Sequence, residues 1–282
     1  MRELVPDNII VGGHRLACGR HGQGEPVVLV HGTPFFSFIW RGLVPALVDA
    51  GYAVHLYDLL GFGYSERPQS THVDTSVSGQ LPVLLELLDH WGLDATHVVA
   101  HDIGGGVAQQ LGIYHPGRVK SITLIDCVSF DSWPSARTRQ QMAEGLDKLL
   151  SAPAETHREH FREWLYSAVH HSESMSNGQA DTYLDMICGP VGQASLFQHQ
   201  IMHYDPIHTS KLEARLGELG QHPVQLLWGR NDAWQVTDWA ERLSTAIPGS
   251  TLTVIDDCGH QALEDQPQQV TQLVLKFLDA QR

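Results

Sequence analysis

Short hydrophobic segments alternate with longer helix-like segments along the first half of the chain. The segments that we expect to be strands are 26–30 (PVVLV), 53–58 (AVHLYD), 97–100 (HVVA) and 119–125 (VKSITLI). Runs rich in leucine or glycine at 78–91 and 104–114 have helical character and lie between strands. Strands that alternate with helices pair in parallel, and helices then cover both faces of the sheet. The pattern therefore predicts an α/β fold built on a mostly parallel sheet.

This alternation stops at residue 131 and resumes after residue 216. The intervening segment is polar, mostly helical in character and rich in His, Trp, Tyr and Met. Strand segments return at 224–228 and 251–255, and a last helix is expected at 266–278. We therefore expect a core domain formed by 1–130 and 217–282, with 131–216 as a helical cap, although a separate helical domain is an alternative. A cap would cover the carboxyl ends of the strands, where pockets of such sheets lie.

The charge balance restricts the partners of this chain. Its 282 residues carry a net charge of −14 with histidine neutral, which repels phosphate backbones and anionic lipids. No apolar run approaches the roughly 20 residues that span a bilayer, and residues 1–8 do not resemble a signal peptide. We therefore expect neither nucleic acid nor membrane as a partner. The sequence leaves the oligomeric state open, and a homodimer is possible.

Cysteine and histidine give no sign of a metal or a disulfide framework. Cys18, Cys127, Cys188 and Cys258 are far apart and form no CxxC pair, so reduced thiols in a cytoplasmic protein are favoured. The chain has 18 histidines, several of them crowded between residues 157 and 171, but none falls in an HExxH pattern. We expect no metal and no cofactor.

The segment 98–106 (VVAHDIGGG) carries the strongest local signal for catalysis. A strand runs directly into a small-x-Asp-x-Gly turn and then into a helix, which is the setting of a nucleophile elbow with Asp102 in the position of the nucleophile. Small residues flank such a turn because it packs closely against its neighbours. The alternative is a glycine-rich turn in which Asp102 only caps the helix.

The segment His31-Gly32-Thr33-Pro34 follows the strand at 26–30. In elbow enzymes a backbone N–H from this loop and the N–H after the nucleophile form the oxyanion hole. This assigns the amides of Thr33 and Ile103 to that role. A plain strand-ending turn is the alternative.

Two later motifs, WGRND and DCGH, each follow an expected strand. The chain order of nucleophile, acid and histidine predicts His260 as a base and Asp232 as the acid that orients it. Asp126, at the end of the strand at 119–125, is the alternative acid.

Taken together, HGTP, DLLGFGYS, AHDIGGG, LWGRND and DCGHQALED resemble the α/β-hydrolase superfamily in order and spacing. The His-Asp-x-Gly-Gly elbow is similar to that of epoxide hydrolases and of haloalkane and haloacid dehalogenases. The resemblance implies the α/β-hydrolase fold and a catalytic triad with an aspartate nucleophile.

An aspartate nucleophile restricts the chemistry. A carboxylate is already ionised near neutral pH and can attack an sp³ carbon to form an alkyl ester on the enzyme. His260 then activates water, which attacks the carbonyl carbon of Asp102. An epoxide would need an acidic donor such as tyrosine for its oxygen, whereas a halide would need N–H donors.

The residues next to the expected nucleophile favour an epoxide. Haloalkane dehalogenases commonly have Trp after the nucleophile, and fluoroacetate-type dehalogenases have Arg, whereas this chain has Ile103; Thr33 stands where the former often have Asn. Epoxide hydrolases use two donors from the cap, usually tyrosines, and Tyr204 is similar in position to the second. The candidates for the first are His157, His160, Tyr166 and Tyr183.

Several aromatic residues are candidates for a pocket between core and cap, or for packing alone. They are Phe35, Trp133, Trp164 and Tyr166. Aromatic walls suit a small apolar organic substrate.

The sequence therefore predicts a hydrolase that forms an alkyl ester on Asp102, with epoxide hydrolysis to a diol as the favoured reaction. A haloalkane or haloacid dehalogenase with an atypical halide site is the alternative. A lactone or C–C hydrolase with Asp102 as a base, and a small-molecule receptor without catalysis, remain further alternatives.

Overall fold

The computed structural model describes residues 2–282, with the side chain of residue 137 excepted. Its centre is an eight-stranded sheet with the strand order β1-β2-β4-β3-β5-β6-β7-β8. The strands are β1 (Asp7–Val11), β2 (His14–His21), β3 (Glu25–Val30), β4 (Tyr52–Tyr57), β5 (Thr96–His101), β6 (Val119–Ile125), β7 (Val224–Gly229) and β8 (Thr251–Ile255). In this order, neighbouring strands from β4 through β3 to β8 pair in parallel. At one edge, β2 pairs antiparallel with both β1 and β4.

Burial on both faces explains why the central strands could be recognised from the sequence. Every residue of β4, β5 and β7 is buried, as expected for strands covered by helices on both sides. The antiparallel pair β1 and β2 was not predicted. Most of β1 is exposed, and β2 begins and ends with polar residues, so neither forms a continuous hydrophobic run.

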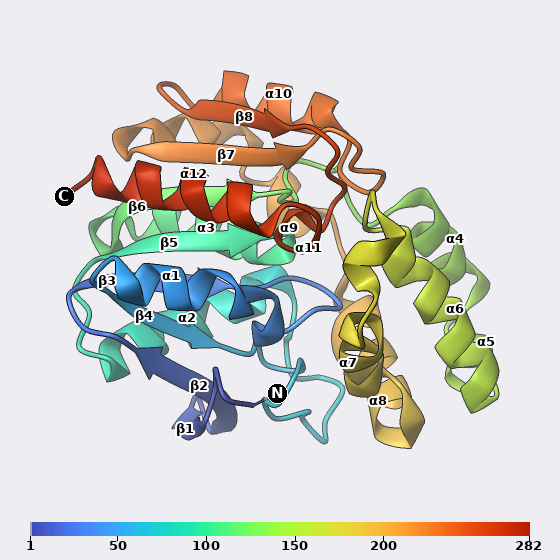
Figure 1. Ribbon diagram of the computed structural model, residues 1–282. Helices are drawn as coiled ribbons and strands as arrows, with labels where there is room; N and C mark the ends of the chain where they lie inside the picture. Colours follow the sequence, from blue (N-terminus) through green and yellow to red (C-terminus); the bar gives the residue numbers. More distant parts are fainter. Residues whose placement is uncertain (1) are drawn as a thin grey trace.

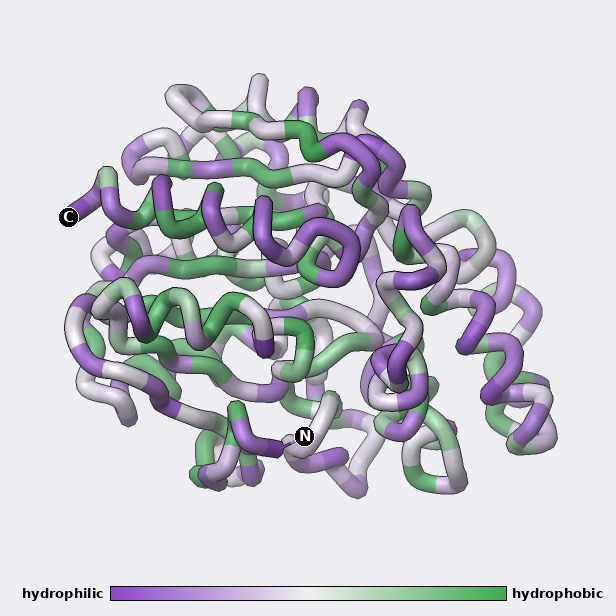
Figure 2. The backbone as a smooth tube through the Cα atoms, in the orientation of Figure 1, coloured by the Kyte–Doolittle hydropathy of each residue, from purple (hydrophilic) through white to green (hydrophobic). Residues whose placement is uncertain are grey.

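Helices cover both faces of the sheet (Figure 1). The helices α1 (Leu43–Asp49) and α12 (Pro267–Asp279) pack together on one face. The short helix η1 (Ser37–Arg41) precedes α1 in the chain. The other face is covered by α2 (Val77–His90), α3 (Ile103–Tyr114) and α10 (Thr237–Ala246), with η2 (Pro116–Arg118) after α3. In Figure 2 the strands are largely hydrophobic, whereas the outer turns of the helices are hydrophilic. The predicted α/β fold is confirmed.

A helical segment lies between β6 and β7. Its elements are α4 (Ala136–Glu144), α5 (Asp147–Leu150), α6 (Ala154–Tyr166), η3 (Ser172–Met175), α7 (Gln179–Ile187), α8 (Gly189–Ser195), η4 (Leu196–Gln200), η5 (Ile201–His203), α9 (Ile207–Ser210) and η6 (Glu213–Gln221). The helices α4 to α8 stand beyond the carboxyl ends of the parallel strands (Figure 1). We call residues 131–216 the cap.

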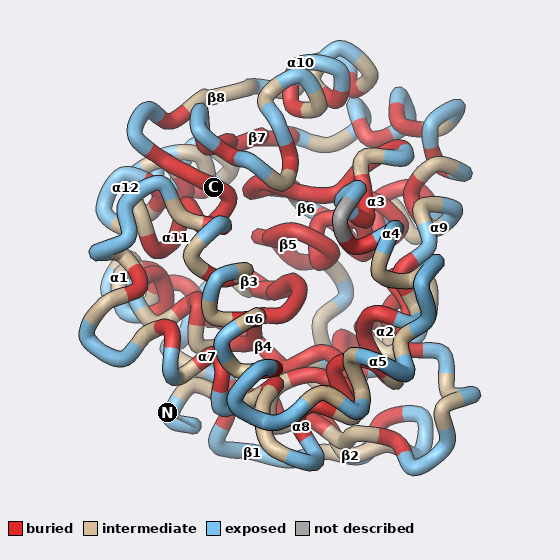
Figure 3. The backbone as a smooth tube through the Cα atoms, turned by 90° about the vertical axis from the view of Figure 1, so that its right-hand side faces the viewer, coloured by how far each residue is buried: buried red, intermediate tan, exposed pale blue. Residues whose placement is uncertain are grey.

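The carboxyl ends of the central strands are buried beneath the cap. Figure 3 looks onto the molecule from the cap side, and the chain around β3, β5 and β6 is buried while the outer turns of the surrounding helices are exposed. The short helix α11 (Ala262–Asp265) lies in the same region, directly after the last strand. The four cysteines are free, and no described helix is long and apolar enough to cross a bilayer.

Candidate active site

Asp102 occupies a sharp turn between β5 and α3. Its φ of +51° lies in a region that non-glycine residues rarely adopt, and the residue is only 4% exposed. A strained turn of this kind, directly between a strand and a helix, is the geometry of a nucleophile elbow.

Glycines allow the elbow to sit this close to its neighbours. A Cβ atom on Gly104 would lie 2.4 Å from the carbonyl oxygen of Val30, and one on Gly105 would lie 2.2 Å from Cβ of Cys127. A Cβ atom on Gly32 would lie 2.4 Å from Oδ1 of Asp102 itself. The small residues that mark this motif in the sequence are therefore required by contact with β3 and with the loop after β6.

A backbone amide faces the Asp102 carboxylate. The Thr33 N–H donates a 2.7 Å hydrogen bond to Asp102 Oδ1. Ile103 is the first residue of α3, where the N–H groups have no acceptor within the helix. The loop after β3 and the start of α3 thus bring together the two residues predicted for the oxyanion hole.

His260 lies between two carboxylates. Its Nδ1 is 2.9 Å from Asp232 Oδ2, and its Nε2 is 3.5 Å from Asp102 Oδ2. Asp232 is fixed through its other oxygen, which accepts hydrogen bonds from the N–H groups of Trp234 and Gln235. The His260 side chain is fully buried, so this contact is shielded from water.

Asp126, the alternative acid, has a different partner. Its Oδ1 accepts a 2.7 Å hydrogen bond from the Gly229 N–H, and its buried Oδ2 has no hydrogen-bond partner among the described residues. Burial and the nearby charge of Asp232 raise its pKa well above the ordinary value. Of the two candidate acids, Asp232 is therefore the one that contacts His260.

Asp102 and His260 shift each other's pKa in opposite directions. Burial acts to raise the pKa of Asp102, but His260, His101 and the Thr33 N–H outweigh burial and lower it. Burial acts to lower the pKa of His260, but Asp232 and Asp102 outweigh burial and raise it well above its ordinary value. Both shifts favour the charged forms, a carboxylate at Asp102 and an imidazolium at His260.

Tyr204 reaches the same site from the cap. Its hydroxyl makes a short hydrogen bond with Thr33 Oγ1, which in turn donates to Gln200 Oε1 at 3.2 Å. Because the Thr33 proton is directed to Gln200, Tyr204 is the donor to Thr33. Burial and the charge of Asp102 raise the pKa of Tyr204, while the Thr33 hydrogen bond partly opposes this. The phenol is therefore a neutral O–H donor beside Asp102.

A pocket of about 410 Å³, counting the part open to solvent, lies between the core and the cap. Its lining consists of Thr33, Asp102, Ile103, Val128, Trp133, Pro134, Ser135, Thr138, Trp164, Tyr204, Trp234 and Gln235. Trp133 and Trp164 were predicted for this pocket. Asp102 is the only ionisable carboxylate among these residues, and none of the described lining side chains is cationic.

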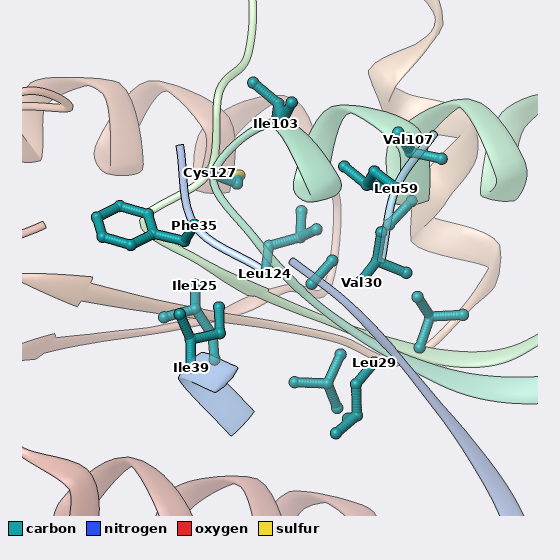
Figure 4. Packing of buried hydrophobic residues seen from close by; sticks show 14 of the residues in the cluster. Leu29, Val30, Phe35, Ile39, Leu59, Ile103, Val107, Leu124, Ile125 and Cys127 are labelled. Carbon is teal, nitrogen blue, oxygen red and sulfur yellow. The ribbon is translucent and has the colours of Figure 1, made fainter. Parts of the chain in front are cut away.

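Two other predicted lining residues lie outside this pocket. Phe35 is fully buried and packs edge-on against Tyr183 and His101, and Figure 4 places it in the hydrophobic core with Ile39 and Ile125. Tyr166 ends α6 and does not line the pocket either. Aromatic composition alone could not distinguish these packing residues from pocket residues.

None of the candidates for a first cap donor lies in the pocket. The Tyr183 hydroxyl makes a short hydrogen bond to Glu264, which also forms an ion pair with Arg41. His157 contacts the Ile187 carbonyl through Nε2 at 2.8 Å, and His160 lies beside Gln141 in a separate small cavity. Tyr183 therefore attaches the cap to the core.

Trp234 was missed at the sequence level. Its ring stacks on His260 with a centroid distance of 4.8 Å and an interplanar angle of 29°, and it stacks equally closely on Trp164. Its position two residues after Asp232, in the turn that holds the acid, was the available signal. Thr138 and Gln235 also line the pocket but carry no signal of their own in the sequence.

Comparison with known families agrees with this fold. Residues 25–267 match the alpha/beta hydrolase fold family. The chain therefore belongs to this family and is a hydrolase of the alpha/beta fold.

Individual relatives differ in activity. A solved alpha/beta hydrolase fold protein from Burkholderia ambifaria is 30% identical, with a TM-score of 0.88 over 96% of this chain and 97% of that chain. A 2-hydroxy-6-oxononadienedioate/2-hydroxy-6-oxononatrienedioate hydrolase from Klebsiella pneumoniae is 26% identical over 96% of this chain and 94% of its own length. Haloalkane dehalogenase 2 from Mycobacterium bovis is 27% identical over 90% of this chain and 88% of its own length. The epoxide hydrolase CorEH shares the fold, with 23% identity and a TM-score of 0.80 over 98% of this chain and 99% of that chain.

Proposed function

We propose that this protein is a hydrolase that forms an alkyl ester on Asp102, and that its reaction is the hydrolysis of an epoxide to a diol. The observation that carries the proposal is the position of the Asp102 carboxylate. Its Oδ1 is held by the Thr33 amide, while its Oδ2 faces the His260 ring. An ionised carboxylate needs no base to attack an sp³ carbon.

In the first half of the reaction, Asp102 Oδ2 attacks a carbon of the epoxide ring. The ring C–O bond breaks, and its electron pair moves onto the oxygen. Tyr204 gives its proton to this oxygen, turning from Thr33 toward the substrate. The products are the alkyl ester, a free hydroxyl and the Tyr204 phenolate. An O–H donor suits this step, because an alkoxide is a far stronger base than a halide.

In the second half, the ester is hydrolysed. Esterification removes the charge of Asp102, one of the two carboxylates that raise the His260 pKa. His260 then releases its proton, which restores the Tyr204 hydroxyl, and accepts a proton from water. The hydroxide attacks Cγ of Asp102, and the Thr33 and Ile103 amides stabilise the oxyanion on Oδ1. The ester C–O bond breaks, and the leaving alkoxide takes the proton of the carboxylic acid formed on Asp102.

The lining of the pocket favours an uncharged apolar substrate, such as an aryl epoxide. Trp133, Trp164 and Trp234 provide flat aromatic walls. The hydrolase relative from Klebsiella is named for a dicarboxylate. No described lining side chain could neutralise a carboxylate, so we do not assign that substrate class to this chain.

Dehalogenation of a haloalkane is the second candidate, because one relative is named as a haloalkane dehalogenase. The hydrogen bonds of two pocket indoles and the side chain of Ile103 argue against it. The indole N–H of Trp133 donates to Thr209 Oγ1, and that of Trp234 donates to Ser167 Oγ, so neither is available to a halide. Ile103, next to Asp102, has no side-chain donor.

The experiment that tests the proposal traps the ester. His260→Gln removes the base and should lower turnover of styrene oxide by about 10²–10⁴-fold. The ester should then accumulate, so intact mass spectrometry should detect protein heavier by one substrate molecule, with the addition on the peptide that contains Asp102. Wild-type protein should release the diol.

The double variant Asp102→Asn/His260→Gln serves as the control and should gain no mass. Haloalkanes of similar size are tested in parallel. An adduct and halide release from haloalkanes alone would favour the dehalogenase. Absence of any adduct and any diol across both substrate sets would refute the ester mechanism for these substrates.

A further inference from the structure

Asp265, at the end of α11, accepts four hydrogen bonds from two parts of the molecule. Its Oδ2 accepts from the N–H groups of Gly259 at 2.8 Å and His170 at 2.7 Å. Its Oδ1 accepts from the His171 N–H at 3.2 Å and from Ser174 Oγ at 2.6 Å. Gly259 directly precedes His260, whereas the other three donors belong to the cap. One carboxylate therefore joins the loop of the base to the cap.

The residues on both sides of His260 are held by the same cap segment. The Gln261 N–H donates a 2.8 Å hydrogen bond to the Ala168 carbonyl oxygen. A Cβ atom on Gly259 would lie 2.8 Å from the His170 nitrogen and 2.9 Å from the Ala168 oxygen. The cap segment 168–170 thus packs directly against the backbone of the base loop, with no space for a side chain between them.

The ring of His260 also depends on the cap. Trp234 stacks on this ring, and Trp164 of α6 stacks on Trp234 with a centroid distance of 4.8 Å. The Trp234 indole N–H donates to Ser167 Oγ, the residue after α6. The backbone beside the base therefore contacts the cap directly, and its ring is linked to the cap through Trp234.

We propose that Asp265 is a positioning residue that makes the orientation of His260 depend on a seated cap. The carboxylate does not line the pocket and touches no reacting atom. Its hydrogen bonds fix Gly259, and through Gly259 the direction in which His260 Nε2 points toward Asp102. This inference rests on the proposed ester mechanism and specifies which half of it the cap controls.

The two halves of the reaction should respond differently to loss of this contact. Asp102 attacks without a base, so formation of the ester does not need an exactly placed His260 ring. Hydrolysis of the ester requires His260 within hydrogen-bond reach of the attacking water. A displacement of about 1 Å can cost about 100-fold in rate, so hydrolysis should be the step that slows.

The test measures both steps in the full-length protein with styrene oxide. Asp265→Asn replaces one acceptor oxygen by an NH₂ group that faces N–H or O–H donors. It should slow ester hydrolysis by about 10–100-fold, while the rate of ester formation changes by less than about threefold. The ester should therefore accumulate in the steady state, with kcat and KM lowered together.

Two further variants make the result specific. Asp257→Asn removes the same charge from the loop of the base, at an exposed side chain that lies 3.8 Å from the His170 ring, and it should behave as wild type. Ser174→Ala removes only one donor to Asp265, on the cap side. It should also slow ester hydrolysis, but less than Asp265→Asn does. It keeps the proposal testable if Asp265→Asn fails to fold.

The outcomes separate this inference from the proposed function. If His260→Gln accumulates ester but Asp265→Asn and Ser174→Ala hydrolyse it at the wild-type rate, Asp265 does not position the base. Equal slowing of both steps would also overturn the proposal, because it would indicate general damage to the fold. If His260→Gln itself accumulates no ester, the proposed function fails first.

Discussion

At the scale of single residues, the carboxyl groups of Asp126 and Asp232 lie close together at the ends of neighbouring strands. The two cannot both be ionised at low cost, because both are buried and their charges repel each other. Asp232 shares its charge with His260 and two backbone N–H groups, whereas Asp126 has the Gly229 N–H and a raised pKa. We therefore expect Asp126 to be neutral near pH 7.

This difference predicts that the change from Asp to Asn has a large effect on turnover at position 232 and a small effect at position 126. Asp232→Asn removes the charge that stabilises the His260 imidazolium, and kcat should fall by about 10³–10⁴-fold. Asp126→Asn replaces one neutral group by another of the same shape, and turnover should change little. Steady-state turnover of an aryl epoxide by the two variants is the measurement. An equally large loss for Asp126→Asn would show that it, too, acts on His260.

The sequence was sufficient to predict the residues that lie on the turns after strands. Asp102, Asp232, His260 and Thr33 come together because each follows a strand of one sheet, and the carboxyl ends of parallel strands meet at one edge. The cap residues were harder. Whether Tyr183 or Tyr166 faces the pocket depends on helix packing, which leaves no local pattern in the sequence.

At the scale of elements, the position of α3 determines where Asp102 stands. This helix packs against β5, β6 and η6, and its glycines let it approach them closely. A Cβ atom on Gly112 would lie 2.6 Å from Leu219 Cδ2 and 2.9 Å from Ile122 Cδ1. The central strands and α3 could be predicted because burial on both sides gives continuous hydrophobic or small-residue runs, whereas the exposed β1 and the polar-ended β2 could not.

The close approach of α3 predicts a cost for added volume. Gly112→Ala forces Leu219 and Ile122 to move and should lower the free energy of unfolding by about 1–3 kcal/mol, reduced by the better helix propensity of alanine. Gly117→Ala is the matched control, because a Cβ atom there would meet nothing within 4 Å. Urea denaturation of both variants measures the difference, and equal stability of the two would contradict the packing argument.

At the scale of the whole molecule, buried neutral histidines make the stability depend on pH. The pKa values of His55, His101 and His199 are each lowered to about 4, chiefly by burial. In the unfolded chain a histidine has a pKa of about 6.5, so between pH 6.5 and 4 the unfolded state binds more protons than the native state. Protonation therefore favours unfolding in this range.

We expect the free energy of unfolding to fall as the pH decreases from 6.5 to 4, by an amount on the order of 2–3 kcal/mol for each of these histidines. His260 does not offset this loss. Its raised pKa contributes stability that is complete below about pH 6.5 and is lost only as the pH rises through the native value.

Urea denaturation at a series of pH values measures the slope. His55→Gln removes one group with a lowered pKa that lies outside the active site, packed against Trp91. This variant should weaken the dependence of the free energy of unfolding on pH, whether or not it changes the stability at pH 7. A free energy of unfolding that stays constant between pH 6.5 and 4.5 would contradict the expectation.

The stack of Trp164, Trp234 and His260 should make the tryptophan spectra of the protein depend on the protonation of His260 and on the position of the cap. Two parallel indoles at 4.8 Å couple electronically and should produce a distinct near-ultraviolet circular dichroism band. A protonated imidazole against an indole quenches its fluorescence, and a neutral one quenches it less. Esterification of Asp102 should therefore brighten Trp234, and displacement of the cap should abolish the coupled band, so that chemistry and cap movement could be followed separately without any added label.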